Sequence, residues 1–297
     1  MLRTARPQPA ADLNPQDEPL APFGPATLAD AADESAGAVA DAADPLFNQS
    51  LEKGLAVLRA FNAAHRTLTL GDLATLTGMT KGSAQRTVHT LQVLGYVGKH
   101  AQTRRFQLLP KVVEIGFNYL ASHPLIRMAH PYLSQLSNAS GETASLTEPI
   151  GAEMLYIAQA ATSRFIPILT PVGARVPMYC TSSGRAFLSC LPDEEARDRL
   201  ERADRPQRTP ATLTGVDAIM ARVADCRRVG FATNVEELFL GDMGVGAPIR
   251  DSRGQVLGAI HLAPPSSRWS PDEMRQKLGP LVIDCARAVS ESLPHSH

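Results

Sequence analysis

The most constraining feature of the chain is the segment Thr69–Tyr96, which has the pattern of two short helices joined by a tight turn. Thr69 is placed to cap the first helix, and Asp72 can accept backbone N–H groups and complement the helix dipole. Gly78 supplies the backbone freedom that a turn requires, and Thr80 can cap the second helix. The spacing therefore predicts a helix-turn-helix.

The second helix combines an apolar stripe with a polar face that carries no carboxylate. A regular helical spacing predicts one buried face, formed by Ala84, Val88, Leu91 and Leu94. The opposite face offers hydrogen-bond donors and fixed positive charge, as a helix that approaches phosphates and base edges must. An ordinary solvated face is the alternative. The candidate DNA-binding side chains are Lys81, Ser83, Gln85, Arg86, His89 and Thr90.

Segments on both sides complete a small DNA-binding domain. Apolar residues before it recur at helical spacing and predict a first helix, with Leu51, Leu55, Leu58 and Phe61 facing inward. After Gly95, apolar and polar residues alternate around a polar turn, which predicts two antiparallel strands, the wing of a winged helix. Arg104 and Arg105 lie at its base as candidate contacts to a phosphate or the minor groove. Plain surface solubility is the alternative for each arginine.

Charge is segregated along the chain, although the net charge of the 297 residues is only −1. Residues 1–45 contain two basic and eight acidic side chains, with too few branched or aromatic residues to offset the entropy of ordering. Residues 46–110 contain eight basic and two acidic side chains. A basic module attached to a larger, nearly neutral one is typical of a nucleic-acid binder with a second function. We predict a disordered tail at 1–45 and a DNA-binding domain at 46–109.

A linker helix is predicted at residues 110–122, which are too apolar all round for a solvated spacer. Such a helix can pack against a symmetry mate, so we expect a dimer. Residues 123–297 interleave helices and strands without a regular βαβ pattern, which favours an α+β domain with a mainly antiparallel sheet. The predicted strands are 143–147, 154–159, 165–169, 245–250 and 256–262, and the predicted helices are 125–136, 182–190, 193–202, 216–228 and 271–293.

Composition argues against several other classes of protein. The four cysteines form no Cys-x-x-Cys pair and have no histidine at zinc-ligand spacing, so we expect reduced, mostly buried thiols, no metal and no cofactor. No signal peptide or membrane-length apolar run is visible, which predicts a cytoplasmic protein. Catalysis is not expected, because the TSSGR turn lacks the first glycine of a nucleophile elbow and GDMGVG is followed by no phosphate-binding helix.

Four collinear segments resemble the IclR family of bacterial transcriptional regulators, over residues 46 to about 293. They are SLEKGLAVLRAF, TLGDLATLTGMTKGSAQRTVHTLQVLGYV, PVGARVPMYCTSSGRAFLSCLP and GFATNVEELFLGDMGVGAPIRDSRGQVLGAIHLAPP. The resemblance implies an N-terminal winged helix-turn-helix joined by a linker helix to a C-terminal effector-binding domain of GAF-like topology. It also implies a homodimer or tetramer that acts on double-stranded operator DNA as a repressor or an activator.

The resemblance further implies a small-molecule site in the second domain. In this family effectors sit between the start of one helix and the facing sheet. Arg185 and His261 could neutralise a carboxylate there, whereas Ser182 could equally be a simple helix cap and His261 a core histidine. The positions that match the effector site are Phe165, Ser182, Ser183, Asn234, Gly244, His261 and Ala263.

The predicted pocket departs from family members that bind glyoxylate or pyruvate. Those members have an aspartate, a cysteine and two serines at the positions of Asn234, Gly244, His261 and Ala263. A glycine opposite an imidazole leaves more room, so we expect an aromatic or longer carboxylate. The motif YCTS-x-GR also resembles the corresponding segment in regulators of protocatechuate and hydroxybenzoate catabolism. This resemblance suggests control of a catabolic operon. The alternatives are a DNA-binding regulator without an effector and an enzyme acting on a small carboxylate.

Overall fold

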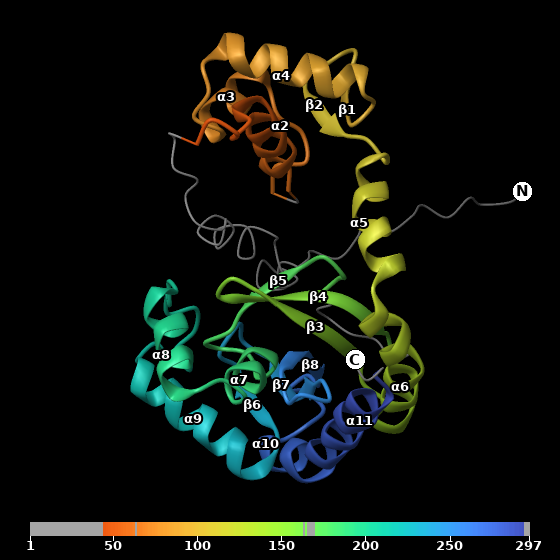
Figure 1. Ribbon diagram of the computed structural model, residues 1–297, viewed down its shortest axis with the longest axis vertical. Coiled ribbons are helices and arrows are strands. Elements are labelled where there is room, and N and C mark those ends of the chain that lie inside the picture. The colour runs from red at the N-terminus through yellow and green to blue at the C-terminus, as the bar shows by residue number, and fades with distance from the viewer. Residues whose placement is uncertain (1–43, 63, 163, 165–169, 294–297) are drawn as a thin grey trace, which may run out of the picture.

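The computed structural model of the chain describes residues 44–62, 64–162, 164 and 170–293. A small N-terminal domain and a larger C-terminal domain are joined by one exposed helix (Figure 1). The predicted strand at 165–169 and all but the last two positions of the tail at 1–45 lie outside the described residues. The described residues confirm the predicted α+β fold with an N-terminal helix-turn-helix.

The small domain packs three helices against a two-stranded antiparallel wing, as predicted. Its elements are α2 (Gln49–Ala60), α3 (Leu70–Leu76), α4 (Lys81–Val93), β1 (Val97–Lys99) and β2 (Phe106–Leu108). Thr69 and Asp72 form a capping box at the start of α3, and Gly78 turns the chain with a φ of +65°. One core joins the helices to the wing, and it includes Val57, Leu73, Val88 and Phe106.

Burial in the small domain differs from the prediction at several apolar positions. Leu51 and Leu55 on α2 are 62% and 44% exposed, whereas Val57 is fully buried. Leu94 is 49% exposed because α4 ends one residue earlier and Leu94 serves as its C-cap. Helical spacing thus located these helices correctly, but three short helices do not enclose every apolar side chain that they carry.

Helix α5 (Val112–Ser122) connects the two domains and contains no buried residue. It begins two residues later than predicted. Lys111, just before it, donates a hydrogen bond from Nζ to the carbonyl oxygen of Leu94 at 3.0 Å, and its ammonium group lies 5.2 Å from the centre of the Tyr96 ring. The start of α5 is therefore fastened to the end of α4. The apolar side chains of the helix stay largely exposed in the single chain, at 69%, 56% and 62% for Val113, Ile115 and Phe117.

The larger domain is built on a six-stranded sheet in which all neighbouring strands are antiparallel, in the order β5-β4-β3-β8-β7-β6. The strands are β3 (Ala144–Ile150), β4 (Glu153–Ala160), β5 (Arg175–Pro177), β6 (Ala232–Val235), β7 (Met243–Arg250) and β8 (Val256–Leu262). Neither β5 nor β6 was predicted. Strands of three and four residues are too short to show a recognisable alternation of apolar and polar residues.

Helices cover both faces of the sheet, and each layer has its own hydrophobic core (Figure 1). One layer holds α6 (Pro124–Ser140) and α11 (Gly279–Ser292), and the other holds α7 (Ser182–Leu188), α8 (Asp193–Arg202) and α9 (Val216–Val229). The predicted final helix is interrupted, because a turn of α-helix at α10 (Pro271–Glu273) passes into the π-helix Met274–Leu278 before α11 begins.

Helix α7 approaches the segment before it very closely because residue 184 is glycine. A Cβ atom on Gly184 would lie 2.2 Å from the Cα atom of Met178. Thr181 caps the helix by accepting a hydrogen bond from the Gly184 N–H group at 3.3 Å. All seven residues of α7 are buried, so the start of this helix faces the interior of the domain.

All four cysteines are free thiols, as predicted. Cys180, Cys226 and Cys285 are buried and Cys190 is partly exposed. Burial raises the pKa of the three buried thiols, which keeps them protonated and poorly nucleophilic. Among the helices that the structure describes, none is both long and apolar enough to cross a membrane.

Candidate functional site

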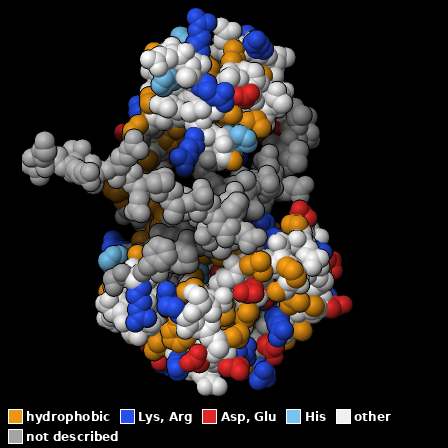
Figure 2. Space-filling view, turned by 180° about the vertical axis from the view of Figure 1, so that it is seen from behind, with side chains coloured by type: hydrophobic (Ala, Val, Ile, Leu, Met, Phe, Trp, Pro, Cys, Tyr) orange, Lys and Arg blue, Asp and Glu red, His pale blue; other side chains and the backbone are white. Residues whose placement is uncertain are grey.

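The predicted DNA-facing side of α4 is open to solvent. Lys81, Gln85, Arg86, His89 and Thr90 are exposed, and Ser83 is half-buried near the helix start. Figure 2 shows Lys, Arg and His side chains over the small domain, whereas Asp and Glu side chains gather mainly on the larger one. The exposed face of α4 thus carries positive charge and donors where no carboxylate on the same helix neutralises them.

Arg105 makes several hydrogen bonds within the small domain. Its Nη2 donates to the carbonyl oxygen of Thr67 at 2.8 Å and lies 3.3 Å from Oδ2 of Asp72. Its Nε donates to the Thr67 hydroxyl at 3.0 Å. The side chain therefore ties the residue before β2 to the start of α3, and it stays a candidate DNA contact through its exposed part. Arg104 is exposed in the turn before β2, with a φ of +56°, and remains a candidate DNA contact.

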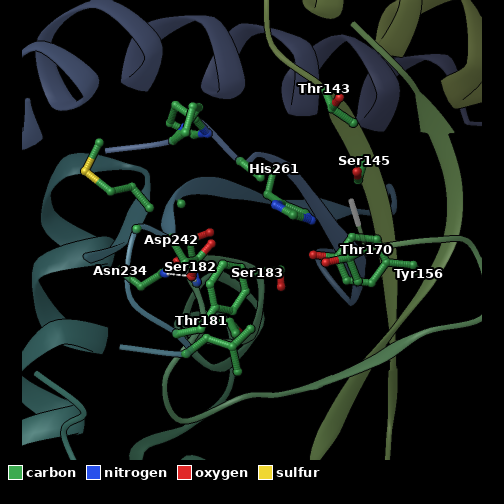
Figure 3. Close-up of a pocket in the computed structure, with 18 of the residues that line it drawn as sticks. Thr143, Ser145, Tyr156, Thr170, Thr181, Ser182, Ser183, Asn234, Asp242 and His261 are labelled. Carbon is green, nitrogen blue, oxygen red and sulfur yellow. Dashed lines mark hydrogen bonds between the residues drawn. The ribbon is translucent and has the colours of Figure 1, made fainter. Parts of the chain in front are cut away.

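A cavity opens in the larger domain between the start of α7 and the central strands (Figure 3). It contains about 740 Å³ of empty space, including its open mouth. Six of the seven predicted effector residues line it, and Phe165 lies outside the described residues. The six are Ser182, Ser183, Asn234, Gly244, His261 and Ala263. Residues far apart in the sequence are thus brought to one cavity by α7, β6, β7 and β8.

A chain of hydrogen bonds crosses one wall of this pocket. The Ser182 N–H group donates to Oδ1 of Asn234 at 2.9 Å, and Nδ2 of Asn234 donates to Oδ2 of Asp242 at 2.7 Å. A Cβ atom on Gly244 would lie 2.2 Å from Oδ1 of Asn234 and 2.6 Å from Oγ of Ser182. The expectation that Gly244 leaves room for a larger ligand was therefore wrong, because the asparagine side chain occupies that space.

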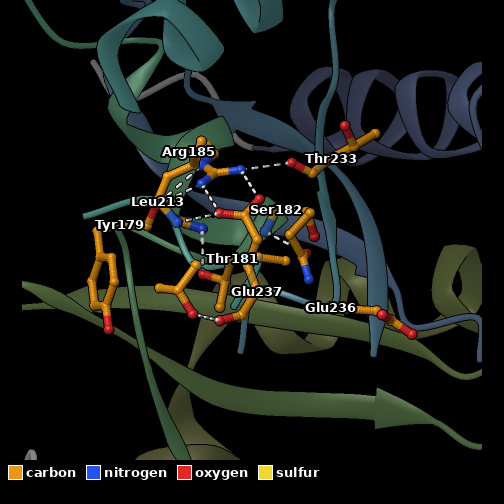
Figure 4. A network of polar contacts seen from close by, with 12 residues as sticks. Tyr179, Thr181, Ser182, Arg185, Leu213, Thr233, Glu236 and Glu237 are labelled. Carbon is orange, nitrogen blue, oxygen red and sulfur yellow. Dashed lines mark hydrogen bonds and ion pairs between the residues drawn. The ribbon is translucent and has the colours of Figure 1, made fainter. Parts of the chain in front are cut away.

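Arg185 also differs from the prediction, because it turns away from the pocket into a buried network (Figure 4). Only 1% of Arg185 is exposed. Its Nη1 lies 2.6 Å from Oε1 of Glu237, and Nη2 donates to Oε2 of the same carboxylate. Nε donates to the carbonyl oxygen of Tyr179 at 3.1 Å. This arginine fixes the position of α7, and its charge is already neutralised by Glu237.

His261 projects into the pocket but does not carry a positive charge there. Burial lowers its pKa to about 4, against a hydrogen bond to the backbone of Leu262 that favours the protonated ring. Burial thus favours the neutral imidazole, so a ligand carboxylate could pair with this ring only by stabilising its protonated form. It packs edge-on against Tyr156, with the ring centres 5.1 Å apart and the planes at 83°.

Asp242 is a pocket residue that the sequence did not reveal. Burial and the nearby charges of Glu237 and Glu236 raise its pKa to about 7, although the hydrogen bond from Asn234 opposes the shift. In the sequence, Asp242 is a single carboxylate directly before the strand that begins at Met243. It lies in the GDMGVG segment, of which only Gly244 was predicted to line the pocket. Tyr156, Gln159 and Thr170 also line the pocket and were missed.

The chemistry of the pocket is that of hydrogen bonding without a fixed cation. Among the described residues that line it, none is lysine or arginine. The polar groups are hydroxyls, amides, one carboxyl group and one neutral imidazole, set beside the rings of Tyr156 and Phe239. In the part of the chain that the structure describes, no group of three His, Cys, Asp or Glu residues is placed to hold a metal ion.

Comparison with known proteins gives matches over both domains. Residues 50–101 match the model of the IclR helix-turn-helix domain, and residues 117–291 match that of the bacterial transcriptional regulator IclR C-terminal domain. The Pca regulon regulatory protein of Pseudomonas putida is 36% identical over 251 residues, which cover 84% of this chain and 86% of that protein.

Solved structures share the fold over nearly their whole length. A protein from Rhodococcus sp. RHA1 described as a transcriptional regulator is 35% identical, with a TM-score of 0.73 and coverage of 82% of this chain and 98% of that one. An IclR homolog from Microbacterium hydrocarbonoxydans, complexed with 4-hydroxybenzoate, is 20% identical, with a TM-score of 0.66 and the same coverage. At that identity the second structure shows a common fold only.

Proposed function

Since the chain belongs to the IclR family of bacterial transcriptional regulators, we propose that it binds operator DNA in response to a small aromatic carboxylate and controls a catabolic operon in the cytoplasm. The observation that carries this proposal is the pocket, where six residues from separate segments converge beside a buried network of polar groups. A partly open pocket of this kind, with converging polar groups, is suited to a small ligand.

The DNA-binding half of the proposal rests on α4 and the wing. The N-terminal residues of α4 and its exposed face provide Lys81, Arg86 and His89, and the wing adds Arg104. A helix of this kind enters the major groove, where side chains near its start reach base edges and the wing lies along the backbone. We assign double-stranded DNA as the partner of this surface.

The effector half rests on the lining of the pocket. The rings of Tyr156, Phe239 and His261, together with Leu238 and Met243, form apolar walls that suit a flat aromatic ligand. A ligand carboxylate would be received by hydroxyl donors such as Ser183, since no guanidinium or ammonium group is among the described lining residues. The name of the Pseudomonas putida relative and the 4-hydroxybenzoate bound to the Microbacterium hydrocarbonoxydans homolog support an aromatic ligand.

We further propose a homodimer, or a tetramer built from dimers, with α5 at an interface. Val113, Ile115 and Phe117 leave an apolar surface on α5 that the single chain does not cover. Apolar surface of this kind is stabilised when a second copy removes it from water. A dimer also supplies two copies of α4, which would match the two halves of a palindromic operator.

A thermal-shift screen tests the proposed effector site. The purified chain would be heated with aromatic and aliphatic carboxylates, and a ligand that binds only the folded state must raise Tm. We expect an aromatic acid to raise Tm by several degrees and Ser183→Ala to reduce that rise. A pocket that accepts no acid would contradict the proposal and leave a regulator without an effector. Turnover of the acid, followed by chromatography, would favour the enzyme alternative.

A further inference from the structure

Most positive charge on the small domain has no carboxylate beside it. Residues 46–110 contain eight basic side chains, and among the described residues only Arg105 forms an ion pair, with Asp72. Glu52 is the other carboxylate of this segment, so positive charges exceed negative charges by six. Six of the remaining seven basic side chains are exposed, and they are Arg59, Arg66, Lys81, Arg86, Lys99 and Arg104.

Arginines on the larger domain are arranged differently. Arg199, Arg202, Arg227 and Arg228 each form an ion pair with an aspartate or glutamate. Figure 2 shows the same contrast on one face of the molecule, where Asp and Glu side chains gather mainly on the larger domain. The surplus of positive charge therefore lies on the small domain, where it attracts polyanions.

The chain enters the small domain from a segment of the opposite charge. Residues 1–43, which we call the acidic segment, contain seven carboxylates and two arginines, so their side chains carry a net charge of −5. The segment leads through Asn48, which caps the start of α2 by accepting hydrogen bonds from the Ser50 and Leu51 N–H groups. Helix α2 packs against α4 in the core of the domain. The acidic segment is thus attached to the helix that contacts α4.

The length of the acidic segment is ample for reaching α4 and the wing. An extended chain of 43 residues covers up to about 140 Å, whereas the 13 residues of α4 are only about 20 Å long. Exposed ion pairs are individually weak. Because the segment belongs to the same chain, however, its concentration near α4 does not fall on dilution, and several weak pairs can act together.

We propose, on the premise that α4 and the wing form the DNA-binding surface, that the acidic segment docks on this surface and competes with DNA for it. Its carboxylates then take the places of phosphates beside Lys81, Arg86, Lys99 and Arg104. DNA of any sequence must displace the segment before the same side chains can contact phosphates. The acidic segment is therefore an internal competitor that lowers the affinity for DNA, most strongly at low salt.

Carbodiimide cross-linking of the full chain tests the docking without DNA. The reagent joins a carboxylate to a lysine amine by an amide bond when the two groups are in contact. At about 50 mM NaCl, we expect links within one chain from the acidic segment to Lys81 and Lys99, mapped by mass spectrometry, and about 300 mM NaCl should remove them. Lys277 is the matched control, because it is exposed on the larger domain and should form no link to the acidic segment.

A neutral-segment variant tests the competition. It carries Asp→Asn at positions 12, 17, 30, 33 and 41 and Glu→Gln at positions 18 and 34. Fluorescence anisotropy with a random DNA duplex should show about tenfold tighter binding than wild type at about 50 mM NaCl, and less than about twofold at about 300 mM. The control variant, Glu194→Gln with Glu201→Gln, removes exposed carboxylates from α8 and should bind DNA like wild type.

The outcomes separate docking, competition and the DNA-binding surface. Absence of links to Lys81 and Lys99 would overturn the docking, even if the neutral-segment variant binds DNA more tightly, because the segment would then only repel DNA from a distance. Links without a gain in DNA affinity would overturn the competition. If neither protein binds any DNA, the proposed DNA-binding surface fails, whereas the cross-links still decide whether the acidic segment docks.

Discussion

Tyr119 on the linker helix α5 donates a hydrogen bond to Glu148 on strand β3, with 2.5 Å between the two oxygens. Nε2 of His123 lies 2.8 Å from the other oxygen of Glu148, and the rings of Tyr119 and His123 meet edge to face. The same strand carries Ser145 into the pocket. A single strand of seven residues therefore contacts both the ligand pocket and the linker.

Glu148→Gln should weaken the communication between effector and DNA without weakening effector binding. The amide removes the charge that holds both Tyr119 and His123, whereas it leaves the pocket lining unchanged. Fluorescence anisotropy of labelled operator DNA, with and without effector, would show a smaller effector-induced change in affinity. Glu114→Gln, at an exposed carboxylate on α5, is the control. A full effector response in Glu148→Gln would show that this contact does not couple the domains.

Asp242→Asn should change how stability depends on pH. The pKa of Asp242 is raised to about 7, so between roughly pH 4 and pH 7 the unfolded chain releases a proton that the folded chain keeps. This group therefore makes the free energy of unfolding fall as pH rises through that window, by at most about 1.4 kcal/mol per pH unit, and then level off. His261, whose pKa is lowered, makes the free energy of unfolding rise with pH below pH 6.5. This contribution is the same in wild type and Asp242→Asn, so it cancels when the two are compared.

Urea titrations of wild type and Asp242→Asn at pH 5, 6, 7 and 8 would measure this effect. The variant should gain stability relative to wild type as pH rises to 7, with little further change above it. Parallel pH profiles for the two proteins would mean that Asp242 ionises normally in the folded chain.

Glu237→Gln should strongly destabilise the larger domain. The substitution leaves the Arg185 guanidinium buried without its counter-charge, and breaking a buried ion pair in this way costs roughly 3–5 kcal/mol. Arg202→Ala at the exposed pair with Asp198 should cost less than about 1 kcal/mol. Denaturant unfolding compares the two. A double variant, Arg185→Met with Glu237→Leu, should be less destabilised than Glu237→Gln, and the reverse order would argue against an uncompensated charge as the cause.

Arg86→Ala should weaken specific DNA binding by roughly 1–3 kcal/mol if the side chain contacts a base. Its guanidinium group lies on the exposed face of α4, where no carboxylate on the helix competes for it. Binding should be measured on operator and random DNA across a range of salt. An equal loss on both would identify a phosphate contact instead.

Arg105→Ala should reduce the stability of the small domain more than its DNA affinity, because Arg105 binds Thr67 and Asp72.

Ile115→Glu on α5 should lower the stability of the proposed dimer, because it would place a charge in the apolar surface that a second copy covers. Light scattering during gel filtration would show more monomer at low protein concentration. The exposed Val93→Glu on α4 is a control away from α5. An unchanged dimer in Ile115→Glu would place the interface elsewhere.

Local signals in the sequence were enough to predict the helix-turn-helix. Thr69, Asp72 and Gly78 act on neighbours only a few residues away, so their roles are visible without a tertiary structure. Burial was harder to predict. Leu51 is exposed despite its helical spacing, because burial depends on what the rest of a small domain can cover.

The pocket could be located only through the family resemblance, and its chemistry only from the structure. Arg185 was expected to face a ligand, but Glu237, 52 positions away, turns it inward. Asp242 was missed because no local spacing relates it to Asn234 or to His261. The predicted residues meet in one cavity where a backbone element sets their position, whereas Arg185 faces away because a distant side chain binds it.

The hydrogen bond from Lys111 to the last turn of α4 has a mechanical consequence. This hydrogen bond and the contact between the Lys111 ammonium group and the Tyr96 ring restrict movement of α5 relative to the end of α4. The two helices then connect Glu148 on the sheet to the helix that we propose to enter the DNA groove. A small rotation of α5 at Glu148 would then displace the distant end of α4 by more than it displaces the contact with Glu148 itself.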